Sequence, residues 1–289
     1  MGSSMSMGVS YAERLDLRED LPPIPHTFHQ VLDVLDKEST TALDIERIVE
    51  QDPVLTMKIL RLANSPYYGG SGGINSVARA VVALGLEEVR NLVIGLSLTS
   101  AFSGDADIEG FAVRELWLHS IGVAKASKMI AENLPGVDAN EIFTAGLIHD
   151  LGRFLLCRYF PEELGEIMAL KERDGITLLE AEERFGLTHG ELGAYLAVSW
   201  GLSDFFANVL RYHHRPQGAG CHGVAVGVVF LADVLCQKLG IGWTINGEVD
   251  KVLVPRSLGL APETVKKIAF RLRQDKDLLI EQWSGVLNV

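Results

Sequence analysis

Apolar residues recur three and four positions apart along most of the chain. This spacing is typical of amphipathic α-helices, and few stretches show the strict alternation of apolar and polar residues that indicates β-strands. The pattern therefore predicts an all-α fold. We expect helices over residues 27–37, 39–51, 53–64, 74–85, 86–102, 110–133, 139–158, 161–173, 177–184, 188–200, 203–214, 223–239 and 262–281.

Stretches rich in glycine and polar residues divide the helices into groups. NSPYYGGSGG, residues 64–73, interrupts the pattern, and SGDADIEG, residues 103–110, is the best candidate for a boundary. The predicted parts are a flexible leader at 1–17, an N-terminal helical subdomain at 18–105, a helical bundle at 106–240 and a C-terminal helical extension at 241–289. The hinge is too short to be a free linker, so the N-terminal layer should pack on the bundle. The extension should hold one amphipathic helix, starting near Ala261 and Pro262, that covers the bundle or pairs with a second copy.

Composition narrows the classes of partner and compartment. Of the 289 residues 47% are apolar, which is enough to bury a sizeable core. The formal net charge of −12, without a basic patch interleaved with aromatic residues, argues against nucleic acid as a partner. The three cysteines lack the spacing of a zinc finger and fit a reducing compartment. The apolar stretch 224–235 is shorter than the ~20 residues that span a bilayer, and no export signal is seen, so we expect a cytoplasmic protein without a membrane contact.

Several histidines lie on the apolar faces of their predicted helices. His119 follows Leu116, and His149 follows Ala145, at the helical spacing of three or four residues. His189 is the first residue of a helix that Thr188 should cap. A single histidine on such a face is more often an ordinary core residue than a ligand, so each one alone means little.

Further inward-facing polar residues change that balance. His213 lies on an apolar face with His214 just beyond it, Asp150 follows a histidine directly, and Asp233 interrupts an apolar helix. An isolated buried carboxylate costs several kcal/mol unless it is neutralised, paired or bound to metal. Among lysines and arginines only Arg153 shares these faces. A positive centre is therefore needed, and a metal ion would supply it.

The chemistry of the donors suggests which metal. The candidate ligands are His119, His149, Asp150, His189, His213, His214 and Asp233. Nitrogen and oxygen donors suit one or two transition-metal ions, iron or manganese ahead of zinc, and the scarcity of cysteine argues against a structural zinc cage. So many donors exceed the needs of one four-coordinate ion, and Asp150 could bridge a pair. The first ion would be held by His119, His149, Asp150 and Asp233, and the second by His189, His213 and His214. Arg153 would either hold an anionic ligand such as phosphate or a nucleotide, or be an ordinary surface or capping residue.

The order of these residues resembles two related groups of proteins. His119, His149, Asp150 and Asp233 resemble the HD superfamily of metal-dependent phosphohydrolases. His189, His213 and His214 resemble the larger ligand set of the HD-GYP cyclic-dinucleotide phosphodiesterases. Both resemblances imply a helical bundle of the HD type with a metal site.

The N-terminal half resembles a third member of this group, the HDOD domain. The segments that carry this resemblance are LPPIPHTFHQVLDVL, IVEQDPVLTMKILRLANSPYYG and INSVARAVVALGLEEVRNLV, and it covers roughly residues 18–240. HDOD proteins are bacterial signalling relatives of HD-GYP enzymes and are regarded mainly as regulatory or scaffold modules. The resemblance thus implies an N-terminal helical layer packed on an HD-type bundle, and a signal-transduction role.

Two departures from HD-GYP enzymes bear on catalysis. After His214 the chain reads RPQGAGCHG where those enzymes have an acidic residue and a Gly-Tyr-Pro element, and Arg153 stands where they have lysine. We therefore expect a regulatory domain with a metal site and a signalling protein as partner. The alternative is a metal-dependent phosphodiesterase or phosphohydrolase acting on a nucleotide or cyclic dinucleotide, with Asp150 and Arg153 as catalytic residues. An open pocket above the metals would favour the enzyme, and a sealed site the regulator.

One loop offers a candidate partner surface. Tyr67 and Tyr68 lie in the glycine-rich stretch 64–73, as residues of recognition loops often do. The plainer interpretation is a connector whose tyrosines pack on the core.

Overall fold

The computed structural model describes residues 22–35, 40–68, 73–102, 110–243, 254–285 and 287. Within these ranges the regular elements are helices and no strand is formed, so the all-α prediction is confirmed. The predicted leader at 1–17 and most of the hinge at 103–110 lie outside the described residues.

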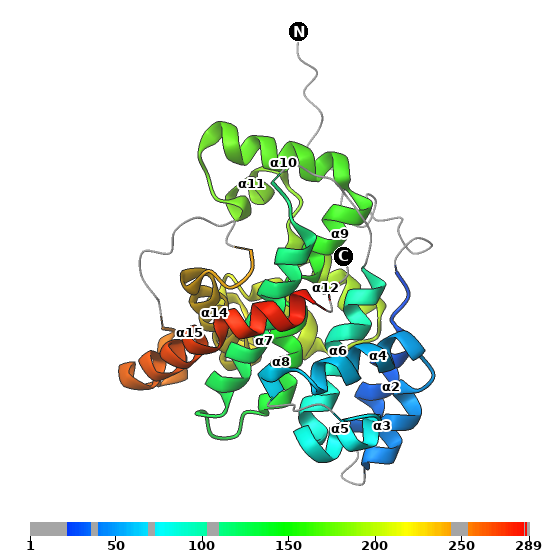
Figure 1. The fold of residues 1–289 in the computed structure, drawn as a ribbon. Coiled ribbons are helices and arrows are strands. Elements are labelled where there is room, and N and C mark those ends of the chain that lie inside the picture. Colours follow the sequence, from blue (N-terminus) through cyan, green and yellow to red (C-terminus); the bar gives the residue numbers. More distant parts are fainter. Residues whose placement is uncertain are drawn as a thin grey trace.

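The N-terminal layer is built from short helices (Figure 1). They are α2 (His26–Leu35), α3 (Ala42–Val49), α4 (Pro53–Ala63), the 3-10 helix η1 (Pro66–Tyr68), α5 (Val77–Leu84) and α6 (Leu86–Ala101). Local capping explains their starts: Thr41 forms a capping box with Asp44, and Pro53 occupies the first turn of α4, as expected. The expected cap at Thr27 is wrong, because α2 already begins at His26.

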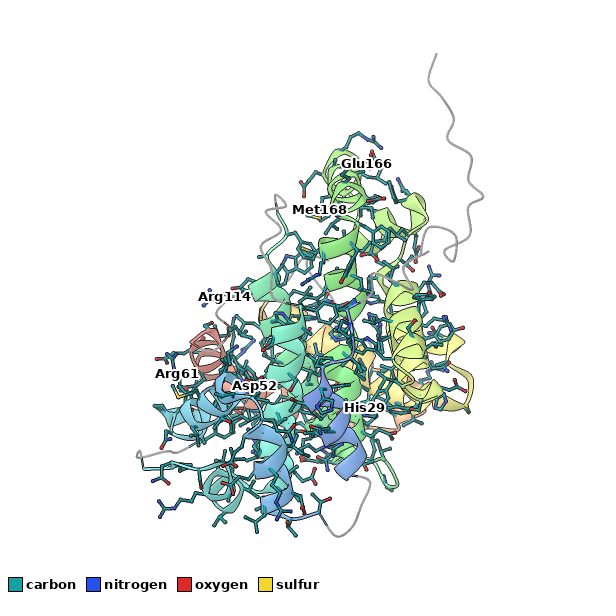
Figure 2. All side chains as sticks on the ribbon, turned by 90° about the vertical axis from the view of Figure 1, so that its right-hand side faces the viewer. His29, Asp52, Arg61, Arg114, Glu166 and Met168 are labelled. Carbon is teal, nitrogen blue, oxygen red and sulfur yellow. The ribbon has the colours of Figure 1, made fainter. Side chains whose placement is uncertain are left out.

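The helical bundle, against which the C-terminal helix packs, comes next along the chain. Its helices are α7 (Val113–Ala131), α8 (Ala139–Ile148), α9 (Leu151–Tyr159), α10 (Pro161–Asp174), α11 (Leu178–Phe185), α12 (His189–Ser199), α13 (Asp204–Tyr212), η2 (Pro216–Gly218), η3 (Gly220–His222) and α14 (Gly223–Leu239). Helix α7 packs against both α8 and α14, and α9 packs against α12. In the view turned by 90°, α10 with Glu166 and Met168 lies at one end of the molecule, away from Asp52 and Arg61 of the N-terminal layer (Figure 2).

The two layers share one hydrophobic core. Helix α6 packs against α2 on one side and α8 on the other, and buried residues such as Leu92 and Trp117 belong to a single connected cluster. The expected packing of the N-terminal layer on the bundle is therefore present among the described residues.

The helix expected over 139–158 is wrong in one respect, because it is divided into α8 and α9. The division falls at His149 and Asp150, where the backbone of Asp150 leaves helical geometry with φ −99° and ψ 14°. Neither proline nor glycine stands at the break, so packing of the surrounding helices, and not local sequence, imposes it.

Within the described residues of the C-terminal extension the helices are η4 (Arg256–Leu258) and α15 (Pro262–Ser284). Helix α15 starts after Ala261 with Pro262 in its first turn, as expected, and packs against α7, α14 and η1. It therefore covers the bundle and touches the N-terminal layer, which is the plainer of the two roles expected for it.

One apolar segment is longer than the sequence analysis assumed. Residues Gly220–Leu239 reach a mean hydropathy of 1.6 over a length that could cross a membrane, judged by length and composition only. In its most apolar 18-residue window 56% of the residues are buried inside the protein, where α14 packs against α7 and α8. This is the pattern of a core helix.

Candidate metal centre

The break between α8 and α9 sets two polar residues side by side inside the bundle. His149 is fully buried, and Asp150 is 4% exposed. Because the chain changes direction here, the Asp150 carboxylate reaches side chains from other helices, among them His189 at the start of α12 and His213 at the end of α13.

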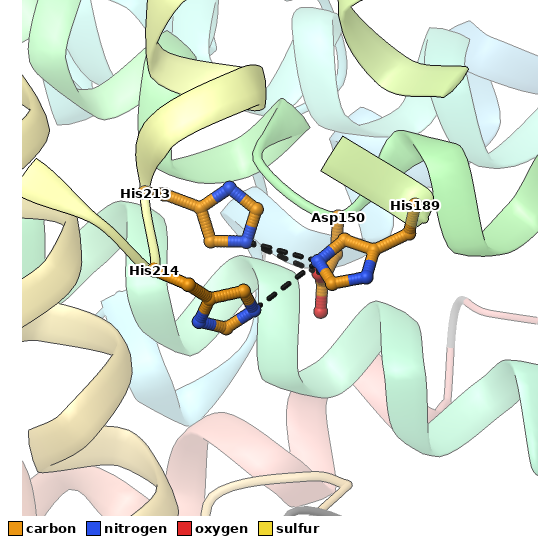
Figure 3. Close-up of side chains that lie close together, drawn as sticks. All are labelled: Asp150, His189, His213 and His214. Atoms are coloured by element: carbon orange, nitrogen blue, oxygen red, sulfur yellow. Dashed lines mark hydrogen bonds and ion pairs between the residues drawn. The ribbon is translucent and has the colours of Figure 1, made fainter. Parts of the chain in front are cut away.

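Three histidines converge on Asp150 (Figure 3). Nε2 of His189 lies 3.3 Å, and Nε2 of His213 lies 3.7 Å, from Oδ1 of Asp150. Nε2 of His189 is also 3.1 Å from Nε2 of His213 and 3.1 Å from Nε2 of His214. One donor atom from each of these residues lies within 4.8 Å of the others.

Hydrogen bonds on the far sides of the rings leave lone pairs facing one another. Nδ1 of His213 lies 2.8 Å from the carbonyl oxygen of Leu210, and because a carbonyl only accepts, Nδ1 carries the proton. Nδ1 of His189 donates in the same way to the Glu182 carboxylate. In neutral rings both Nε2 atoms then present lone pairs to each other. This arrangement is repulsive unless a proton or a cation lies between the rings, so the donor set fits a metal ion.

A second group lies beside the first. It consists of His119, His149 and Asp233, whose donor atoms again lie within 4.8 Å of one another. Nδ1 of His149 donates to the carbonyl oxygen of Gly146 at 2.7 Å, and its Nε2 is buried without a hydrogen-bond partner among the described residues. Nε2 of His119 lies 3.0 Å from Oδ1 of Asp233. Here too an orphaned nitrogen and a buried carboxylate suit a cation.

The loop after α14 holds the ring of His119. The carbonyl oxygen of Ile241 lies 3.3 Å from Nδ1 of His119. The next residue, Gly242, has φ +65°, and a Cβ there would lie 2.2 Å from the backbone nitrogen of His119. Only glycine permits this close approach, so the loop and α7 are fitted to each other at the site.

The surroundings favour ionised carboxylates, and they favour neutral imidazoles at His213 and His214 but a protonated imidazole at His149. Burial raises the pKa of Asp150, but Arg153 and His149 lower it well below its usual value. Burial lowers the pKa of His213 well below its usual value and that of His214 to about 3. For His149, burial lowers the pKa, but the Asp150 carboxylate outweighs it and raises the pKa. Carboxylates and neutral imidazoles are the protonation states that bind metals.

Glu182 is a site residue that the sequence analysis missed. It is fully buried, and its carboxylate accepts hydrogen bonds from Nδ1 of His189 and, at 3.1 Å, from the His189 backbone nitrogen. Burial raises the pKa of Glu182, but His189 and Arg153 lower it. One signal was its position four residues after the buried Leu178, one turn along the same face of α11, but the charged residues around Glu182 hide that signal in the sequence.

Arg153 is buried, so its interpretation as a surface residue is wrong. Its Nε donates to Oδ1 of Asp150 at 2.9 Å, and its side chain is 1% exposed. Its other two guanidinium nitrogens are buried without hydrogen-bond partners among the described residues. The guanidinium carbon also lies 5.6 Å from the centre of the Trp243 ring. Arg153 thus offers two unused donors beside the cluster.

All seven predicted ligands lie in one region, but their grouping differs from the expected one. We assigned Asp150 to the group of His119, His149 and Asp233. Its Oδ1 instead faces the three histidines of the other group, while its Oδ2 lies 3.4 Å from Nε2 of His149. This position between the groups is the one a carboxylate bridging two ions requires. Which of these residues ligate a metal stays a prediction.

Comparison with known families gives a match over most of the chain. The HDOD domain family matches residues 21–216. Among curated proteins, an uncharacterized protein from Treponema pallidum (strain Nichols) is 25% identical over 266 residues, which cover 87% of this chain and 47% of the relative. The chain therefore spans about half the length of that relative.

Solved structures share the whole fold. An HDOD domain protein of unknown function from Geobacter sulfurreducens superposes with a TM-score of 0.81 at 27% identity, covering 97% of this chain and 100% of its own. A candidate signal transduction protein from Marinobacter aquaeolei VT8 gives 0.80 at 27% identity, covering 95% of this chain and 61% of its own. A candidate phosphohydrolase from Shewanella amazonensis SB2B gives 0.71 at 24% identity, covering 94% and 97%, a likeness of fold alone.

Proposed function

Because the chain belongs to the HDOD domain family, we propose that it is a regulatory module of bacterial signal transduction whose buried histidine and aspartate cluster binds one or two transition-metal ions. Iron or manganese suits the mixed nitrogen and oxygen donors, and zinc is the alternative. The signalling role is also supported by the similarity to the Marinobacter protein, which covers nearly all of this chain.

The observation that carries this proposal is the closure of the site. Of the seven candidate ligands, six are at most 4% exposed, and the side chain of His214 is 16% exposed. A metal enclosed in this way would be retained and would stabilise the fold, but a substrate phosphate would have little access to it. The donors therefore suit a structural or sensing metal better than a catalytic one.

The surface of the N-terminal layer supports a protein partner. Four large apolar side chains are strongly exposed there, with Leu43 at 56%, Val54 at 63%, Met57 at 70% and Val82 at 84%. Exposed apolar residues that form one contiguous patch are typical of contact surfaces, and these four lie on α3, α4 and α5, which pack against one another. We propose that a signalling protein in the cytoplasm docks on this layer.

One observation favours a second function. The two unpartnered guanidinium nitrogens of Arg153 lie beside Asp150, inside a cluster suited to metal. Arginine binds phosphate through two parallel hydrogen bonds, so a phosphate group would satisfy both nitrogens. The second candidate is therefore a metal-dependent phosphohydrolase or phosphodiesterase, with Asp150 and Arg153 in contact with the substrate.

A turnover assay separates the two functions. Protein loaded in turn with iron, manganese and zinc would be incubated with bis(p-nitrophenyl) phosphate and with a cyclic dinucleotide. For a regulator we expect background rates with every metal, together with a rise in melting temperature on loading, since a ligand of the native state stabilises it. Robust metal-dependent hydrolysis that disappears in His149→Ala, while the circular dichroism of the helices is kept, would make the enzyme the correct function.

A further inference from the structure

A cavity of about 270 Å³ lies where the N-terminal layer, the bundle and α15 meet. It is bounded by η1 and α6 on one side, α7 and α8 on another, and α15 on the third. Ile121, Lys125 and Lys128 of α7 line it, and at about 100° per residue they lie roughly 180–240° around the helix from His119. None of the candidate metal ligands lines the cavity, so it is a separate site on the other side of α7.

The inner part of the cavity is apolar apart from one amide. Leu279 and Trp283 of α15 are 2% and 4% exposed, and Asn91 of α6 is 2% exposed. Both the oxygen and the nitrogen of the Asn91 amide are buried without a hydrogen-bond partner among the described residues. A buried amide left unpaired costs about 1–3 kcal/mol, so a ligand that paired with it would recover a substantial free energy.

Aromatic rings form the side walls. Tyr67, Tyr68 and Phe143 line the cavity, and the two tyrosine rings meet edge to face with centres 4.7 Å apart. The hydroxyl of Tyr68 donates to Glu88 at 2.8 Å, and the ammonium of Lys125 lies 4.3 Å from the centre of the Tyr67 ring. The tyrosines singled out in the sequence are therefore held in place by their own contacts, and together with Phe143 they give the cavity an aromatic wall.

Two further cationic side chains, those of Lys128 and Arg271, line the cavity. Lys128 is half-buried and Arg271 is exposed, and neither has an ion pair within the part of the chain that the structure describes. Lys125 pairs with Asp275 at 3.1 Å. Burial lowers the Lys125 pKa, Asp275 opposes this, and the nearby Arg271 guanidinium adds a smaller lowering effect. Glu88 and Glu132 also line the cavity, and Glu88 accepts a hydrogen bond from the Tyr68 hydroxyl. Lys128 and Arg271 are therefore the cations available to an anionic group, with the Glu132 carboxylate opposing them.

We propose that this cavity binds an adenine nucleoside monophosphate, with the base beside the Asn91 amide and the phosphate near Lys128 and Arg271. An amide oxygen and nitrogen side by side match the amino group and ring nitrogen of adenine. Aromatic side chains bind the faces of a base, and arginine and lysine bind phosphate. Ligand pockets commonly measure about 300–1,000 Å³, and this cavity of about 270 Å³ lies just below that range, so it has room for one base and excludes a dinucleotide.

Isothermal titration of the full chain with adenosine monophosphate tests the proposal. We expect measurable binding to the wild-type protein, and a loss of at least tenfold in affinity in Asn91→Leu, which keeps the number and branching of the side-chain heavy atoms but removes the amide. The melting temperature of Asn91→Leu should be unchanged or higher, because an unpaired buried amide is removed. Lys128→Gln should weaken binding by about tenfold, whereas Lys267→Gln, an exposed lysine one turn before Arg271 on α15, should bind as the wild type does.

Three results would overturn the proposal. The first is no heat of binding with adenosine monophosphate at millimolar concentration. The second is equal affinity in Asn91→Leu and Lys267→Gln when both melt as folded proteins. The third is binding of inorganic phosphate as tightly as the nucleotide, because the base would then contribute nothing.

Discussion

The Nε2 atoms of His189 and His213 face each other at 3.1 Å, while the opposite nitrogen of each ring is committed to an acceptor. The metal assignment depends on these two facing nitrogen atoms. An acceptor facing an acceptor in a buried site is unfavourable, and desolvation strengthens the repulsion. A cation among these atoms, with Asp150 as its charged ligand, converts the repulsion into coordination.

Glu182 gives the first test at this scale. Its carboxylate orients the His189 ring, and partners of this kind typically contribute 10–100-fold to metal affinity. We expect Glu182→Gln to lower metal affinity by about that factor, measured by competition with a chelator of known affinity. The control is Glu183→Gln, the next residue on α11, whose carboxylate pairs at the surface with Arg215. Equal affinities in the two variants would mean that Glu182 does not position a ligand.

The site residues could be predicted only in part from the sequence. His119, His149 and His189 were recognisable because each falls on an apolar helical face. Glu182 was not, because it stands in the charged run EAEERF, which is typical of a solvated face. Its burial depends on α12 packing against it, and that contact is not encoded locally.

At the scale of helices, the close contact of α9 with α12 holds the two halves of the cluster together. Gly152, two residues after Asp150, lies so near α12 that a Cβ would be 1.8 Å from the carbonyl oxygen of His189. The backbone of one helix therefore touches the first turn of the other. The break before α9 exists because this contact, which Gly152 permits, and the polar cluster fix the direction of the chain.

Substitution at two glycines tests this contact. Gly152→Ala should force the helices apart and lower the free energy of unfolding by about 3 kcal/mol, the upper part of the range for overpacking. Gly165→Ala in α10, where a Cβ would meet nothing within 4 Å, should instead raise it by about 0.5–1 kcal/mol. Urea denaturation measures both. A Gly152→Ala variant as stable as the wild type or more stable would show that α9 and α12 are not in the close contact described.

At the scale of the molecule, α15 joins the bundle to the N-terminal layer. Trp283 is 4% exposed and its ring lies against Gly95 of α6, while η1 also contacts α15. The all-α class and most helix positions could be predicted, because they follow from the period of apolar residues. The junction could not, since its cavity brings together residues as distant in sequence as Tyr67 and Trp283.

Removing the Trp283 side chain tests how much this junction contributes to the stability of the shared core. Trp283→Ala should lower the free energy of unfolding by about 3–5 kcal/mol, as expected for the removal of a buried large aromatic side chain. Phe270→Ala on the same helix, at 63% exposure, should change it by less than about 0.5 kcal/mol. Calorimetry should show one transition in all three proteins. A small effect of Trp283→Ala, or a separate early transition in the wild type, would contradict a shared core.

The central claim is that the buried cluster holds metal, and elemental analysis of the purified protein tests it most directly. We predict one or two transition-metal ions per chain, iron or manganese ahead of zinc, in the wild-type protein. Asp150→Ala should retain the least metal, because it removes the carboxylate that faces both groups of histidines. A wild-type protein without bound metal, whose melting temperature does not rise when iron, manganese or zinc is added, would contradict the account.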